Sequence, residues 1–125
     1  MNSKPVFALD EVESDLKSAI AHYEGWRLDG KAHVLALYDE TIRWIEWNPD
    51  LFPKKFGRVH RAILKRSYYI VYFIQEPERS LVVAVLDGRR KPSEIRTIVR
   101  RRKRDEPVAG DEPPPSVSFL TWLDI

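Results

Sequence analysis

The chain has 125 residues, no cysteine and a formal net charge of +2, and this length suits one domain that buries roughly two thirds of its unfolded surface. Without cysteine it can form neither disulfides nor thiolate metal sites, and no apolar run is long enough for a signal peptide or a membrane span, so we expect a soluble, cytoplasmic protein. Residues 1–50 carry five Lys/Arg and ten Asp/Glu, residues 51–104 carry sixteen and four, and residues 105–125 carry none and five, so the near-neutral total hides a strongly basic middle.

The N-terminal residues predict a short strand and then a helix. Residues 4–9 alternate around Val6 and Ala8, which is a weak strand signal and suggests an edge strand. Asp10 and Glu13 stand at the cap and third helical positions of a capping box, and Gly25 is a typical helix end.

A second helix is predicted from Lys31 to Trp47, and Asn48-Pro49 should end it. Its inner stripe is predicted at Val34, Leu37, Thr41, Trp44 and Ile45. Because the link between the two helices is short, we expect an antiparallel helical hairpin whose apolar faces cover one side of a sheet.

The loop at 48–58 contains two prolines, so we predict no regular strand pairing there. It begins a stretch, residues 51–75, that contains no acidic residue. Six cations in or beside it alternate with the rings of Phe52, Phe56, Tyr68 and Tyr69; the cations are Lys54, Lys55, Arg58, Arg61, Lys65 and Arg66. Such a mixture suits single-stranded nucleic acid, although a solvated basic hairpin over core aromatics has the same composition.

Three consecutive strands are predicted at 59–64, 68–75 and 81–87. Their connections leave no room for a crossover helix, so neighbouring strands should run antiparallel. The second and third strands are apolar at both side-chain phases, which indicates burial on both faces. We expect the helical hairpin to cover one face and a partner protein to cover the other.

The C-terminal part is divided from the rest in our prediction, with a domain at 1–99 and an appended segment at 100–125. Residues 93–104 are predicted as a short basic helix, and the run 100–104 as a solvated or disordered extension. Beyond it, an acidic proline-rich linker leads to the apolar residues 117–125, which we predict to fold back on the sheet of this chain or of a neighbour; a disordered terminus and a dimer contact through Trp122 are the alternatives.

The residues resemble the RelE/ParE superfamily of toxins from type II toxin-antitoxin systems, which includes plasmid stabilisation proteins. The resemblance covers about residues 4–96. It rests on "VESDLKSAIAHYEG", "NPDLFPKKFGRVHRAIL", "YYIVYFI" and "SLVVAVLDGRRKP" in this order. It implies an α+β fold, a small antiparallel sheet with an N-terminal helical hairpin on one face, and a cognate antitoxin that is acidic or binds DNA.

The resemblance also implies site residues. Arg61 and Arg90 match two arginines that face RNA in the ribosome-dependent ribonucleases of the family. The C-terminal Tyr or His that serves the chemistry of several such nucleases has no counterpart, because Arg96 falls near its place. The chain also departs from the family pattern at Arg66-Ser67-Tyr68, where relatives often have Phe-Pro-Tyr, and at Asp87, where many have His.

RNA cleavage needs positive charge at the phosphorane together with an acid and a base. Charge could come from Arg61, Arg90, Lys54 or Lys55, and Tyr68 or a desolvated lysine could move the proton. His60 is a weak candidate because it neighbours Arg61 and so points to the opposite face of a strand. For partner or nucleic-acid binding we select the arginines of the basic region, namely Arg58, Arg61, Arg66, Arg89, Arg90 and Arg96.

We predict neither a metal nor another cofactor, since His22 and His33 have no companion ligands in the sequence. Three functions remain open. The chain could be a growth-inhibiting toxin that poisons DNA gyrase, as ParE-like members do, or a ribosome-dependent mRNA endonuclease, which would be metal-independent, as RelE-like members are. The third is a non-toxic module that binds nucleic acid or an antitoxin.

Overall fold

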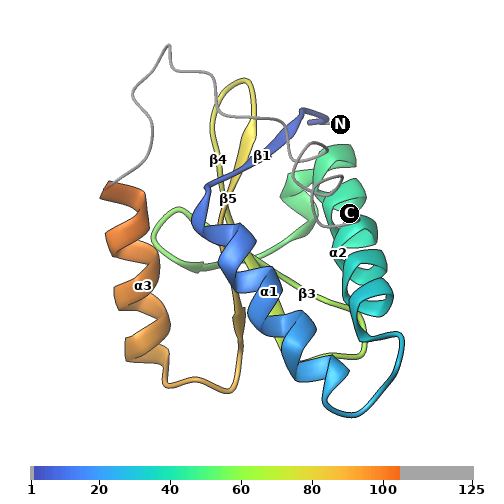
Figure 1. The fold of residues 1–125 in the computed structure, drawn as a ribbon. Coiled ribbons are helices and arrows are strands. Elements are labelled where there is room, and N and C mark those ends of the chain that lie inside the picture. Colours follow the sequence, from blue (N-terminus) through green and yellow to red (C-terminus); the bar gives the residue numbers. More distant parts are fainter. Residues whose placement is uncertain (1, 105–125) are drawn as a thin grey trace.

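The computed structural model describes residues 2–104 and shows an α+β fold, as predicted (Figure 1). The elements in chain order are β1 (Val6–Ala8), α1 (Glu11–Glu24), α2 (Gly30–Trp47), the short 3-10 helix η1 (Pro49–Leu51), β2 (Lys54–Phe56), β3 (Val59–Ile63), β4 (Tyr69–Gln75), β5 (Ser80–Asp87) and α3 (Pro92–Arg104). Within these residues no helix combines the length and the apolar character that a membrane span requires. The predictions for residues 105–125 fall outside the described residues.

The sheet has the strand order β1-β5-β4-β3-β2. The three central strands pair antiparallel, as predicted, in the registers Arg61↔Tyr72 and Tyr72↔Ala84. The predicted N-terminal edge strand is also present, but β1 runs parallel to β5, with Phe7 opposite Leu81. The sheet is therefore mixed: the predicted antiparallel strands are joined by one parallel strand at this edge, whose direction the sequence did not indicate.

Both side-chain phases of β4 and β5 are buried, as their apolar sequences predict. The chain itself provides the cover, because α1 and α2 form an antiparallel hairpin on one side and α3 packs against β5 as well. In Figure 1 the two strands lie between α3 at the left and α2 at the right. The inference that a partner must cover the second face is therefore wrong. Residues 93–104 were predicted as a helix but not as cover for the sheet, and the run 100–104 was predicted as a solvated or disordered extension.

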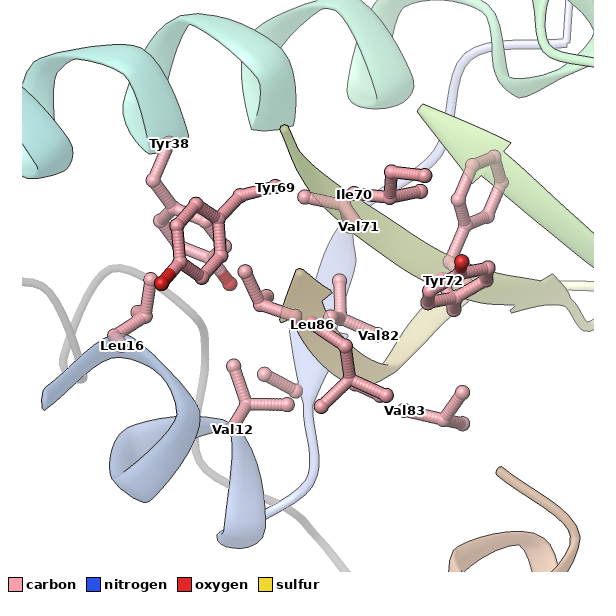
Figure 2. Close-up of a cluster of buried hydrophobic side chains, with 14 of the residues drawn as sticks. Val12, Leu16, Tyr38, Tyr69, Ile70, Val71, Tyr72, Val82, Val83 and Leu86 are labelled. Carbon is pink, nitrogen blue, oxygen red and sulfur yellow. The ribbon is translucent and has the colours of Figure 1, made fainter. Parts of the chain in front are cut away.

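The core lies between the helical hairpin and the central strands, and Figure 2 shows part of it, with Val12 and Leu16 of α1 and Tyr38 of α2 close to side chains of β4 and β5. Leu16 and Tyr38 are both fully buried. Residues one turn apart on α1 provide this packing, which is the helical periodicity that the sequence shows.

The helix bounds are close to those predicted, but two local details differ. Asp10 makes no side-chain cap hydrogen bond, and the Glu13 amide instead donates to the Asp10 carbonyl at 3.1 Å, so the capping box is not formed. On α2 the buried stripe runs through Val34, Leu35, Tyr38, Thr41, Ile42 and Ile45, whereas Trp44 is 51% exposed. The predicted stripe was rotated about the helix axis relative to the buried one, because Trp44 was assigned to the core.

A short strand also forms where the two prolines suggested none. Both prolines precede β2, which pairs with β3 through Lys54↔His60 and Phe56↔Val59 with a register shift between them. Gly57 makes the connecting turn with φ +53°, a left-handed conformation that costs glycine little. The Arg61 amide donates to the Pro53 carbonyl at 3.0 Å and extends this pairing by one bond.

Candidate functional site

Arg61 lies in the middle of the sheet on the face that carries α3. Its cross-strand partner Tyr72 shares that face, the Tyr72 and Phe56 ring centroids are 6.3 Å apart, and the Arg96 guanidinium of α3 lies 5.7 Å from the Phe56 ring. Burial raises the pKa of Tyr72, and the positive charge of Arg61 opposes that shift. We call Phe56, Arg61, Tyr72 and Arg96 the α3-face cluster.

A second group forms at the end of β5. The Arg89 side chain donates to both carboxylate oxygens of Asp87, at 3.1 and 2.8 Å, and its guanidinium lies 4.1 Å from the ring centroid of Tyr68. Tyr68 is 61% exposed. These hydrogen bonds from Arg89 lower the pKa of Asp87, so Asp87 acts as an anchor for Arg89.

Gly88 allows this turn to close on β4. Its amide donates to the Tyr68 carbonyl at 2.7 Å, and a Cβ at position 88 would lie 2.5 Å from Cδ1 of Ile70. Any larger residue would therefore require the Ile70 methyl to move, and its Cβ would lie only 3.0 Å from the Tyr68 carbonyl oxygen. We call Tyr68, Asp87, Gly88 and Arg89 the β5-end cluster.

Arg90 is exposed just before α3 and borders an open hollow of about 320 Å³ that Ser93, Glu94, Thr97 and Ile98 also line. On β4, Tyr69 pairs with Asp87, and Tyr72, three residues further along, pairs with Arg61. These two pairs are therefore about 10 Å apart along the strand, at the usual rise per residue. Arg90 follows three residues after Asp87. The structure therefore places Arg61 and Arg90 in different groups of neighbours.

The remaining predicted cations are exposed. Lys54 and Lys55 lie on β2, Arg58 lies in the turn before β3, and Arg66 occupies the turn before β4 with a left-handed φ of +59°. Among the described residues, neither these cations nor Arg96 are in ion-pair contact with a carboxylate.

His60 has a structural role, as its position next to Arg61 suggested. It is 5% exposed, stacks on Phe73 with ring centroids 4.9 Å apart, and holds Nδ1 2.7 Å from the Phe52 carbonyl. A carbonyl can only accept, so Nδ1 carries the proton. The imidazole lies on the face of the sheet that carries α1 and α2, opposite the α3-face cluster.

Sequence reasoning missed the contact that fixes α3. The Asp15 carboxylate of α1 accepts two hydrogen bonds from Arg102, at 2.5 and 2.9 Å, and a third from the Val85 amide at 2.9 Å. Arg102 also donates to the Val83 carbonyl at 3.1 Å. β1 pairs with β5 only as far as Val82. Asp15 and Arg102 therefore supply the hydrogen-bond partners of the β5 backbone groups that follow, the Val83 carbonyl and the Val85 amide. Arg102 is thus part of the fold and not of a solvated extension.

Among residues 2–104 no three His, Asp or Glu side chains converge on a possible metal position. The His22 and His33 rings instead contact the Tyr23 ring, at centroid distances of 5.5 and 5.1 Å.

Comparisons with known proteins give a structural match. A chain of the chromosomal ParDE TA system from P. aeruginosa superimposes with a TM-score of 0.58 and 12% identity, covering 68% of this chain and 96% of that one. No protein-family model and no curated protein matches the sequence. The chain has a RelE/ParE-like fold. At this identity the likeness establishes the fold alone, so the chemistry must be argued from the residues.

Within the RelE/ParE-like fold, Tyr72 is the residue that sequence reasoning overlooked. Tyr68 was chosen because it borders the basic hairpin, but its ring stacks with Arg89 at the β5-end cluster. Tyr72 lies opposite Arg61 on the neighbouring strand. From the sequence alone it looks like one more core aromatic of an apolar strand. The pairing Arg61↔Tyr72 would have been needed to identify it, and register is not visible in a strand that is apolar on both phases.

Proposed function

We propose that this protein is the toxin component of a type II toxin-antitoxin system and that it inhibits bacterial growth. The observation that carries the proposal is the fold match to a chain of a ParDE TA system, of which 96% is covered. The sequence motifs around Arg61 and Arg90 resemble the same superfamily independently of that match.

For the mechanism we propose binding of an acidic target, with DNA gyrase as the target, in the manner of ParE-like toxins. Support comes from the distribution of the cations, which are exposed on β2, on two turns and on α3 and do not converge on one reacting centre. The histidine nearest to Arg61 is buried on the other face of the sheet. Such a surface suits electrostatic recognition of a macromolecule.

An antitoxin partner belongs to this proposal. Its expected chemistry is an acidic segment that lies on the α3-face cluster and the exposed lysines of β2, because those cations lack carboxylate partners among the described residues. Apolar cover for β4 and β5 is not part of the reason, since the chain already buries both strands.

The runner-up is a ribosome-dependent mRNA endonuclease, and one observation favours it. Arg61 and Tyr72 are cross-strand neighbours on one face, so a phosphate held by the guanidinium would lie on the side of the sheet that carries the Tyr72 phenol. That phenol is buried in the free chain and would have to become exposed on RNA binding to move a proton. In this mechanism Arg61 provides charge and Tyr72 acts as the acid.

Two assays with the purified chain distinguish the mechanisms. Gyrase poisoning predicts inhibition of supercoiling and accumulation of cleaved DNA, with no new cuts in mRNA during translation in vitro. The endonuclease predicts mapped cuts in ribosome-bound mRNA and a loss of those cuts in Tyr72→Phe, which keeps the ring and removes the hydroxyl. Arg43→Ala is the matched control in both assays, because Arg43 forms an exposed ion pair with Asp39 on α2. If neither assay responds to the wild-type chain, both mechanisms are wrong.

A further inference from the structure

The unpaired part of the β3 edge lies beside an apolar groove. Among residues 2–104, the β2 pairing reaches β3 only at Val59, His60 and the Arg61 amide, and no other described strand lies beside the residues that follow on that side. The groove has a volume of about 450 Å³ and lies between α2, η1 and the end of β3; its lining residues are Glu40, Thr41, Trp44, Leu51, Phe52, Ile63 and Lys65.

The alternating directions of the backbone hydrogen bonds along β3 show which N–H and C=O groups face this groove. The Leu64 amide donates inward to the Tyr69 carbonyl at 2.9 Å, whereas the Arg61 amide donates outward to Pro53. Outward and inward residues alternate along an antiparallel strand, so the N–H and C=O of Ile63 point outward. Within the described residues neither group has a hydrogen-bond partner. This is an open position for one more extended segment.

The side chains around the position are unusually apolar for a surface. Trp44, Leu51 and Ile63 are 51%, 52% and 56% exposed, and Trp47 nearby is 46% exposed. Lys65 adds a positive charge at one end of the groove. A segment that pairs with Ile63 would therefore need apolar side chains at one phase and would tolerate an acidic residue near Lys65.

We propose that residues 117–125 of the same chain occupy this groove by adding a strand beside Ile63. These residues lie beyond the described part of the chain and enter through their sequence alone. "VSFLTWLDI" is rich in strand-forming residues, and one phase places Val117, Phe119, Leu123 and Ile125 on the same face.

Chain length and charge support this occupant. The twelve residues 105–116 reach up to roughly 37 Å at ~3.1 Å per residue in an extended proline-rich conformation, well beyond the ~13 Å radius of gyration of a 100-residue domain. Residues 105–112 include four carboxylates and no cation, and they follow α3, whose described cations Arg96, Arg100 and Arg101 are exposed. The linker can therefore run over the basic surface on its way to the groove. This assignment does not depend on the proposed toxin function.

Amide hydrogen exchange of the full-length chain by NMR tests the proposal at one atom. The Ile63 amide should exchange at least ~10-fold more slowly than its intrinsic rate, because the added strand accepts its hydrogen bond. In Phe119→Asp/Leu123→Asp it should exchange at nearly the intrinsic rate, while the Val71 amide in β4 stays protected and shows that the fold is intact. Ser116→Asp/Ser118→Asp adds the same charge outside the groove-facing phase and should keep Ile63 protected.

The groove side provides the second arm. Leu51→Asp should release the Ile63 amide, whereas Leu28→Asp, at a fully exposed position away from the groove, should not. An unprotected Ile63 in the wild-type chain overturns the proposal, and so does protection that survives Phe119→Asp/Leu123→Asp. Protection that falls on dilution contradicts the same-chain assignment and identifies a second copy as the occupant.

Discussion

Asp15 joins three parts of the chain, because its carboxylate accepts from the Val85 amide, 70 positions away, and from Arg102, 87 positions away. It is buried, and Arg102 is only partly exposed. Removing one partner of such a pair leaves an uncompensated charge and, here, an unpaired amide at the sheet edge.

Asp15→Ala should therefore cost about 3–5 kcal/mol of the free energy of unfolding. Urea denaturation measures this, with Arg43→Ala as the control, since that exposed pair should be worth less than about 1 kcal/mol. A loss no larger than the control's would show that the contact does not hold α3.

Tyr38 gives a prediction about pH. It is fully buried, and burial together with the negative charge of Asp15 raises its pKa well above the ordinary value near 10. Above that ordinary value the unfolded chain loses the phenol proton while the folded chain keeps it, so stability is fully present below about pH 10 and falls as pH rises beyond it.

The free energy of unfolding, measured between pH 8 and 11, should fall less steeply above pH 10 in Tyr38→Phe than in the wild type. Tyr69 and Tyr72, whose pKa values burial also raises, set the slope that remains. An equal slope in both proteins would contradict the assignment to Tyr38.

At the scale of elements, the three central strands, both helices of the hairpin and their antiparallel directions were predictable, because each has a periodicity and clear breaks. The β1–β5 pairing was not, because a three-residue edge strand carries no information about its partner or direction. α3 was underestimated for a different reason. A run of five cations suggests a solvated segment, and only the contact with Asp15 shows why Arg102, in the middle of the run, is half-buried.

The same limit applies to the site. Every cation from Lys54 to Arg66 that the sequence selected is exposed, other than the half-buried Arg61, so their assignment to a binding site stays a prediction. It could not identify their neighbours, since the Arg61–Tyr72 and Arg96–Phe56 contacts depend on register and on the docking of α3.

The strands and the arginines should respond oppositely to substitution. Val83→Ala removes buried methyl groups from β5 and should cost on the order of 1–4 kcal/mol, with little specific effect on target binding. Arg90→Ala should leave the melting temperature within a few degrees and reduce activity, because an exposed charge contributes little to folding. Calorimetry beside a growth assay measures both, and an unfolded Arg90→Ala would make Arg90 a structural residue.

At the scale of the whole molecule, the chain covers its own central strands, and the surface that we propose for partner binding carries the exposed cations of β2 and α3. An acidic antitoxin should bind that surface mainly through charge, so its affinity should fall as ionic strength rises. Co-expression with the product of the neighbouring gene should restore growth, and titration of the purified pair at 50 and 300 mM salt should show the weakening. Binding that does not change with salt would contradict an electrostatic interface.

The most direct measurement for the account as a whole is growth after induced expression of this chain alone in bacteria. Viable counts should fall sharply with the wild-type chain, and should recover with Arg61→Ala or Arg90→Ala present at equal abundance and with unchanged melting temperatures. Normal growth at high levels of the folded wild-type protein would contradict the toxin proposal and favour a non-toxic binding module with the same RelE/ParE-like fold.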